Sequence, residues 1–195
     1  MKNTLCRLFL LAGLSAGADR ASALPVEILP RHYSFDQATD TGTYSYHDET
    51  GMQLVDGVRG IAPWDSDLGH GPGYEWVGWA SDPVVNIDFT FGSLTRIDAI
   101  HVSTTQDHLD DVVLPHVFLY ADNGTGFSLI ASLLNPESSA NDRQYRTFQF
   151  DTTGLDALRI RVSLHQSLDG PWTFTDEIDF FQNRDCVPES TSTGW

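Results

Sequence analysis

Apolar and polar residues alternate with a period of two along much of this chain. Residues 85–91 read Val-Asn-Ile-Asp-Phe-Thr-Phe, and residues 158–164 read Leu-Arg-Ile-Arg-Val-Ser-Leu. This alternation predicts strands that bury one face and expose the other, as antiparallel sheets do. No long segment carries apolar residues at helical spacing. Further strands are predicted near residues 97–104, 115–121, 127–133, 145–150 and 174–181.

Turn-forming residues separate the predicted strands. Phe91-Gly92-Ser93, the run from Asp122 to Gly126, and Thr153-Gly154 all lie between apolar stretches. Many short strands with such turns between them are typical of an all-β sandwich or jelly roll. The apolar members of the alternating faces are expected to form its core: Val85, Ile87, Phe89, Ile100, Val117, Leu119, Phe148, Ile160, Val162 and Ile178.

The first 23 residues have the layout of a secretory signal peptide. A basic start at Lys2 precedes an apolar stretch from Leu5 to Leu14, and Ala21-Ser22-Ala23 has the small residues of a cleavage site. Arg7 interrupts the apolar stretch, so a disordered or packed N-terminal helix is the alternative. We therefore expect a signal peptide (1–23), one β-sandwich domain (24–183) and a flexible tail (184–195).

Charge and cysteine content restrict the expected location of the protein and the kinds of partner it can bind. The chain has 27 acidic and 11 basic residues, a net charge of −16, and its one lysine is Lys2. So acidic a chain repels nucleic acid and anionic lipid, and suits cations and neutral glycans. Cys6 lies in the predicted signal peptide, which leaves Cys186 alone and excludes an internal disulfide or a cysteine-built metal site. Export without disulfides favours a secreted, bacterial-surface or periplasmic location.

Three segments carry a family pattern, and they follow one another in a fixed order. They are Leu54-Val55-Asp56-Gly57-Val58-Arg59-Gly60 with Trp76-Val77-Gly78-Trp79; Val85-Asn86-Ile87-Asp88-Phe89 with Ile97-Asp98-Ala99-Ile100; and the run from Leu114 to Tyr120 with the run from Trp172 to Ile178. Together they resemble the galactose-binding-like family, in particular the discoidin (factor V/VIII type C) modules attached to bacterial glycosidases. The resemblance covers residues 54–181, most of the predicted domain.

The resemblance implies an eight-stranded jelly roll with binding loops at one end and, in many members, a buried calcium ion. Matched residue by residue, the ion would be held by Asp56, Glu177 and nearby backbone carbonyls; hard oxygen ligands of this kind suit Ca²⁺. Ile61 stands where many members have Ser or Thr, and the stretch 62–74 is longer than in the family pattern. The alternative is that Asp56 only caps a turn and Glu177 pairs with an arginine.

Aromatic and histidine side chains in predicted loops are the candidate ligand contacts. Aromatic rings stack on the C–H faces of sugars, and polar side chains bond the hydroxyls. We expect a shallow site built from these residues, with Arg59 as a hydroxyl donor: Trp64, His70, Tyr74 and His108. Trp76 and Trp79 are three apart in a predicted strand and should face opposite sides, at least one of them in the core.

A glycan-binding module is the leading functional hypothesis, and two other classes stay open. One is a surface adhesion or structural protein with a protein partner. The other is a glycan-active hydrolase, since acidic pairs such as Asp110 and Asp111 could in principle serve as its carboxylates. No nucleophile elbow, zinc-protease motif or phosphate loop is present in the sequence. We therefore expect a non-catalytic protein.

Overall fold

The computed structural model describes residues 24–39, 46–60, 63–65, 75–107, 110–134, 136, 144–166 and 170–184. These form eight strands and one short 3-10 helix: β1 (Leu24–Glu27), β2 (His32–Phe35), η1 (Gln53–Val55), β3 (Val77–Ala80), β4 (Val84–Gln106), β5 (His116–Asp122), β6 (Ser128–Leu133), β7 (Gln144–His165) and β8 (Trp172–Arg184). Every strand pairing is antiparallel. The predicted all-β jelly roll of about eight strands is confirmed.

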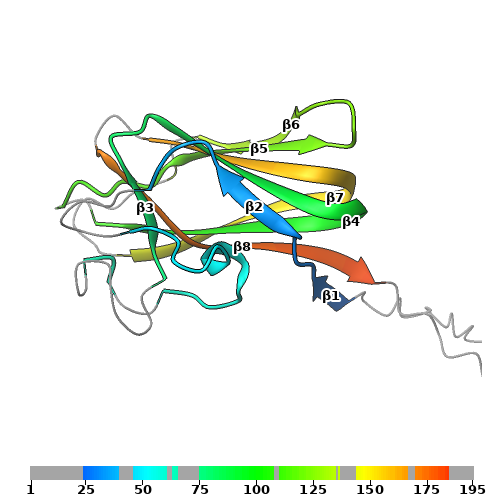
Figure 1. Ribbon diagram of the computed structural model, residues 1–195, viewed down its shortest axis with the longest axis horizontal. Helices are drawn as coiled ribbons and strands as arrows, with labels where there is room; N and C mark the ends of the chain where they lie inside the picture. The colour runs from blue at the N-terminus through cyan, green and yellow to red at the C-terminus, as the bar shows by residue number, and fades with distance from the viewer. Residues whose placement is uncertain are drawn as a thin grey trace, which may run out of the picture.

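The strands form two layers that share β4 and β7 (Figure 1). In one layer, the first part of β4 pairs with β2 and with the end of β7, which continues to β5 and β6. In the other layer, the second part of β4 lies between the start of β7 and β8. The far edge of β8 pairs with both β1 and β3. The sheet is thus folded over on itself into a sandwich.

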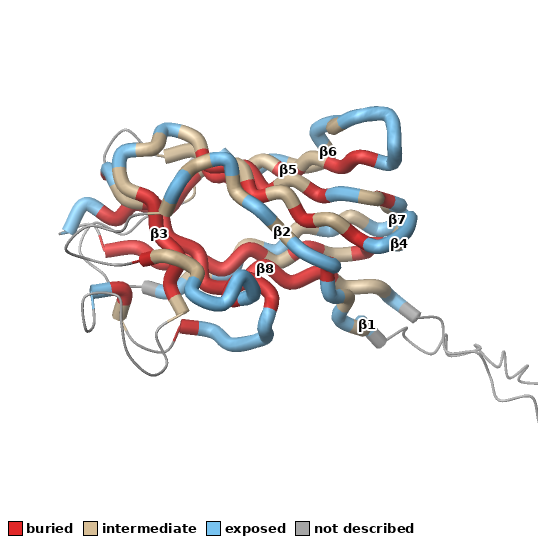
Figure 2. The backbone as a smooth tube through the Cα atoms, in the orientation of Figure 1, coloured by how far each residue is buried: buried red, intermediate tan, exposed pale blue. Residues whose placement is uncertain are grey.

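The main core lies between the layers and follows the predicted alternation. Nine of the ten predicted core residues are buried there, and Phe148 is partly buried against the same cluster. On β4, Val85, Ile87 and Phe89 point inward, while Asn86 and Asp88 between them are partly exposed. Figure 2 shows β8 buried along most of its length, because η1 and its flanking segment pack against it.

Two predicted turns are bends within long strands. Residues 91–93 lie inside β4, and residues 153–154 lie inside β7. The β4–β7 register shifts between Thr90 and Thr95. Gly154 there has φ +92°, which favours glycine. These turn-forming residues lie at the corner where β4 and β7 pass from one layer to the other. Each predicted turn is therefore a bend within one continuous strand.

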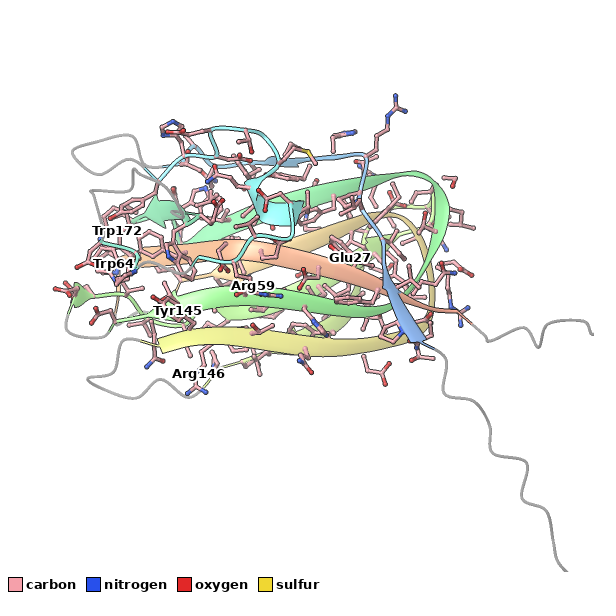
Figure 3. The ribbon with its side chains drawn as sticks, turned by 90° about the horizontal axis from the view of Figure 1, so that it is seen from below. Glu27, Arg59, Trp64, Tyr145, Arg146 and Trp172 are labelled. Atoms are coloured by element: carbon pink, nitrogen blue, oxygen red, sulfur yellow. The ribbon has the colours of Figure 1, made fainter. Side chains whose placement is uncertain are left out.

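Trp76 and Trp79 are both fully buried, and on opposite sides as predicted. Trp79 belongs to the main core. Trp76 belongs to a second cluster at one end of the sandwich, with Tyr46, Trp64, Val112, Phe174 and, partly buried, Trp172. We call this second group the end cluster. It lies at the end of the sandwich remote from β1 (Figure 3).

The two ends of the described strands lie side by side, because Leu24 of β1 is opposite Arg184 of β8. The predicted signal peptide (1–23) and residues 185–195 of the predicted tail lie outside the described residues. Within the described part of the chain, no helix is both long and apolar enough to span a bilayer.

Candidate functional site

Phe174 of β8 holds the end cluster together. Its ring centroid lies 4.8 Å from that of Tyr46, 5.4 Å from Trp64 and 5.5 Å from Trp172. Tyr46 meets it edge-on, while Trp172 is nearly parallel at 10°. Such edge-to-face and stacked pairs add attraction beyond the burial of their area. The cluster is therefore a rigid base for whatever lies outside it.

Two rings lie on the outer side of this base. Tyr145 of β7 is 48% exposed and stacks on the buried Trp76, with centroids 5.6 Å apart and planes 12° from parallel. The ring of Trp172 is partly buried and contacts the rings of Phe174 and Tyr46. Figure 3 shows Tyr145, Trp172 and Trp64 at the same end of the molecule. Rings fixed from behind and open in front suit the C–H face of a sugar.

Arg146 follows Tyr145 directly in β7, so its side chain lies on the opposite face of the strand. Its Nε is buried and has no hydrogen-bond partner in the part of the chain that the structure describes. A buried donor of this kind carries a desolvation cost until something accepts its hydrogen bond. Because the atom is buried, a sugar on the Tyr145 ring does not reach it, and Arg146 is not part of the candidate site.

The expectation of an exposed Trp64 is wrong. Its ring is only 7% exposed and stacks at 30° on Phe174. Burying so large an apolar ring stabilises the domain, and the neighbouring rings offer it a complementary surface. Trp64 therefore supports the end of the sandwich from within.

Of the other predicted ligand contacts, Arg59 is described, and it does not lie beside Trp64 (Figure 3). Arg59 is exposed, and its guanidinium forms an ion pair with Asp179 of β8. Figure 3 shows it on the body of the sandwich, away from the rings of Trp64 and Trp172. His70, Tyr74 and His108 lie outside the described residues, so their part in a site stays a prediction.

Sequence reasoning named neither Tyr145 nor Trp172 as a ligand contact. Tyr145 stacks on Trp76, which is far from it in the sequence. Only the folded structure brings the two rings together. One signal was present in the sequence: Tyr145 begins a predicted strand whose outward positions are otherwise polar, namely Thr147 and Gln149. Single exposed apolar residues are common on protein surfaces, so this signal alone could not have identified the site.

We expect Gly78→Ala to destabilise the end cluster. An added Cβ at Gly78 would lie 2.3 Å from Cε1 of Phe174, so the ring must shift. Overpacking of this kind costs about 1–3 kcal/mol, measurable by urea denaturation. The control is Gly92→Ala, because a Cβ there meets no atom within 4 Å. Equal stability of the Gly78 variant and wild type would contradict the packing described above.

A second candidate site lies where η1 and its following turn pack against β8. Glu177 is 1% exposed, and its Oε2 accepts a hydrogen bond from the N–H of Gly57 at 3.1 Å. Within the described residues, its Oε1 is buried without a hydrogen-bond partner. Asp56 is exposed, and its Oδ1 caps its own turn by accepting from the N–H of Val58 at 2.8 Å. No described arginine pairs with Glu177, since Arg59 pairs with Asp179.

The surroundings of Glu177 disfavour its ionised form. Burial, together with the nearby carboxylates of Asp179, Asp56 and Asp176, raises the pKa of Glu177 from 4.5 to about 8, against the opposing hydrogen bond from Gly57. Burial also raises the pKa of Asp176. A cation beside these groups would relieve their repulsion and satisfy the free oxygen of Glu177.

The side chains alone cannot surround a metal ion. No group of three or more His, Cys, Asp or Glu side chains is placed to hold one in the described residues. Ca²⁺ takes six to eight oxygen ligands, and backbone carbonyls often supply several of them. A calcium ion at Glu177 would therefore need most of its ligands from main-chain oxygens, and the unpartnered Oε1 of Glu177 is the feature here that leaves room for one.

No protein-family model matches this chain, and no curated protein matches it. Solved structures do match. The truncated AlyQ with CBM32 and alginate lyase domains has a TM-score of 0.53 at 12% identity, over 83% of this chain and 34% of AlyQ. The family 32 carbohydrate-binding module of NanJ from Clostridium perfringens, in complex with galactose, has a TM-score of 0.50 at 12% identity, over 82% of this chain and 100% of the module.

A third match is to a GH29 fucosidase from Ruminococcus gnavus in complex with fucose, at a TM-score of 0.50 and 10% identity. It covers 78% of this chain but 25% of the fucosidase, so this chain spans a small part of that enzyme and the whole of the NanJ module. At such identities the likeness concerns the fold. Together with the two-layered arrangement of eight antiparallel strands, it shows that this chain has the jelly-roll fold that the family 32 carbohydrate-binding modules of AlyQ and NanJ also have.

Proposed function

We propose that this chain is an exported, non-catalytic module that binds a neutral glycan at the end of the sandwich where the end cluster lies. The observation that carries the proposal is the pair of outer rings, Tyr145 and Trp172, each stacked on a buried aromatic residue. The fold supports it, because AlyQ and NanJ use this fold in domains that bind carbohydrate.

The net charge of the protein favours a neutral glycan over an anionic one. The chain has a net charge of −16, so its overall field opposes an anionic polysaccharide. A neutral sugar does not meet that repulsion. We expect a site built on these two rings to be shallow, with single-site dissociation constants on the order of micromolar to millimolar. Tight attachment would need several modules or sites acting together.

The proposed calcium ion has a structural role, remote from the sugar. Bound by Glu177 of β8 and by the turn after η1, it would join the segment around Asp56 to the last strand. Support comes from the buried free oxygen of Glu177 and the repulsion among its neighbouring carboxylates. No sugar-binding step depends on it.

An array of immobilised neutral and acidic glycans tests the proposal. Wild type should bind a subset of the neutral glycans, and Tyr145→Ala and Trp172→Ala should each weaken that binding at least tenfold. Tyr145→Ala removes an exposed ring and should also keep the melting temperature within a few degrees. The matched control is Leu129→Ala, which truncates an exposed apolar side chain on β6. Binding at the wild-type level in both folded ring variants would contradict a site at this end, and a protein that binds no glycan would contradict the proposed function.

A further inference from the structure

The outer face of the layer formed by β4, β7 and β5 has a hollow that the proposed end site does not use. Its volume is about 360 Å³, and the residues lining it include Asn86, Tyr120, Phe127, Arg161, Ser163 and His165. Small-molecule sites in proteins are typically about 300–1,000 Å³. The hollow is therefore large enough for a small ligand.

Strand register brings these side chains together. Ser163 of β7 lies opposite Asn86 of β4 on one side and opposite Phe118 of β5 on the other. Tyr120 lies opposite Arg161 in the same way. Their neighbours along each strand, such as Ile87, Leu119 and Val162, are buried in the main core, so the hollow sits on the opposite, outward face.

Two aromatic rings lie in the hollow. Tyr120 stands on β5, and Phe127 lies just before β6; both are partly exposed. The guanidinium of Arg161 lies 4.4 Å from the centroid of Phe127, and that of Arg159 lies 4.7 Å from it. These cation–π contacts hold Phe127 in place. The Tyr120 ring is thus the surface on which an apolar ligand face can stack.

The polar groups of the hollow are fixed and nearly balanced in charge. Arg161 donates two hydrogen bonds to Asp88, from Nε at 2.6 Å and from a terminal nitrogen at 2.8 Å. The Asn86 amide donates to Asp36 at 2.6 Å, and His165 Nε2 lies 3.1 Å from Ser163 Oγ. Burial and the nearby His116 lower the pKa of His165, which keeps its imidazole neutral at pH 7. A hollow without net charge favours a neutral ligand, since a charged one would lose hydration without gaining a partner.

We propose that this hollow is a second ligand site, which binds one neutral pyranose ring. The C–H face of the sugar stacks on Tyr120, and its hydroxyls exchange hydrogen bonds with Asn86 and His165, which are partly exposed. The site belongs to a different layer from β3 and β8, where Trp76 directly precedes β3 and Trp172 begins β8. Two weak sites on one domain would engage one polysaccharide with an avidity above that of either alone.

The test is the same glycan array, probed with variants of the hollow in two backgrounds. In a Tyr145→Ala/Trp172→Ala background, residual binding to a subset of neutral glycans is expected. Adding Tyr120→Ala or Phe127→Ala should weaken that binding at least tenfold, whereas Tyr120→Phe keeps the ring and should retain most of it. The control is Thr90→Ala, an outward position on β4 that is not part of the hollow.

Each outcome decides the proposal. Phe127 lies outside a regular strand, so Phe127→Ala provides the answer if Tyr120→Ala fails to fold. Folded variants of both that bind every glycan as their parent does would overturn the second site. A loss of binding confined to acidic glycans would contradict the proposal that the ligand is neutral. If the hollow variants lose all binding while the Tyr145 and Trp172 variants bind like wild type, the second site stands and the end site is wrong.

Discussion

Replacing Phe174 with alanine is expected to lower the free energy of unfolding by about 3–5 kcal/mol, the range for truncating a buried aromatic side chain. Phe174 is fully buried and contacts Tyr46, Trp64 and Trp172. Its removal leaves a cavity that three large rings cannot close without losing their mutual stacking. Urea denaturation gives the loss of stability, and near-ultraviolet circular dichroism reports the loosened tryptophans.

Two further variants test whether the loss of stability comes from the buried ring of Phe174. Phe174→Leu keeps most of the volume and should cost less, while Leu94→Ala, at an exposed position, should change stability by less than about 0.5 kcal/mol. If Phe174→Ala cost no more than Leu94→Ala, the end cluster would not be a second core. Glycan binding should fall along with stability, since the rings at Tyr145 and Trp172 rest on this cluster.

Calcium is expected to stabilise the native protein, and to do so more at pH 8.5 than at pH 5.5. A ligand at a hundredfold excess over its dissociation constant adds about 2.7 kcal/mol to the free energy of unfolding. For a domain of this size, each kcal/mol raises the melting temperature by roughly 2–4 °C. At pH 5.5 Glu177 is protonated in the native state, so it cannot act as a ligand until it loses the proton.

Without calcium the pH dependence should run the other way. The native pKa of Glu177, about 8, lies above its ordinary value of 4.5, so the folded chain binds more protons than the unfolded chain between these limits. Stability should therefore fall as pH rises from about 4.5 to about 8, and level off above that. Melting curves in EDTA across this range measure the effect.

Glu177→Gln should remove both effects. It abolishes the rise in melting temperature on adding calcium and, above pH 8 in EDTA, makes the protein more stable than wild type. The matched control is Glu27→Gln on β1, which changes one exposed carboxylate outside this site. A calcium effect that survives Glu177→Gln would show that any ion binds elsewhere.

The fold could be predicted because its core strands alternate plainly. Residues 85–91 of β4 read as one buried face and one polar face, and the structure buries that face. The corner near Gly92 could not be told from a turn, because a chain that leaves a sheet and one that bends into a second layer use the same residues. Only the pairing of β4 with both β2 and β8 distinguishes them.

The candidate site was harder to predict, because its parts come from distant segments. Trp64 sits in a stretch rich in glycine, aspartate and proline, which indicates an exposed loop, yet its ring is buried. Tertiary contact with Phe174 overrides the local polarity. Tyr145 and Trp76 meet only across the folded sandwich. Glu177 was identified through the family resemblance, and its burial beside three other carboxylates became visible only in the structure.

The most direct test of the central claim is a calorimetric titration of wild type and Tyr145→Ala with the neutral oligosaccharide that binds best on the array. Tyr145 is exposed, so its truncation should leave the fold intact. We predict a dissociation constant at least tenfold weaker for the variant, equivalent to about 1.4 kcal/mol of binding free energy. An unchanged constant in a folded Tyr145→Ala protein, repeated with Trp172→Ala, would contradict a glycan site at this end of the sandwich.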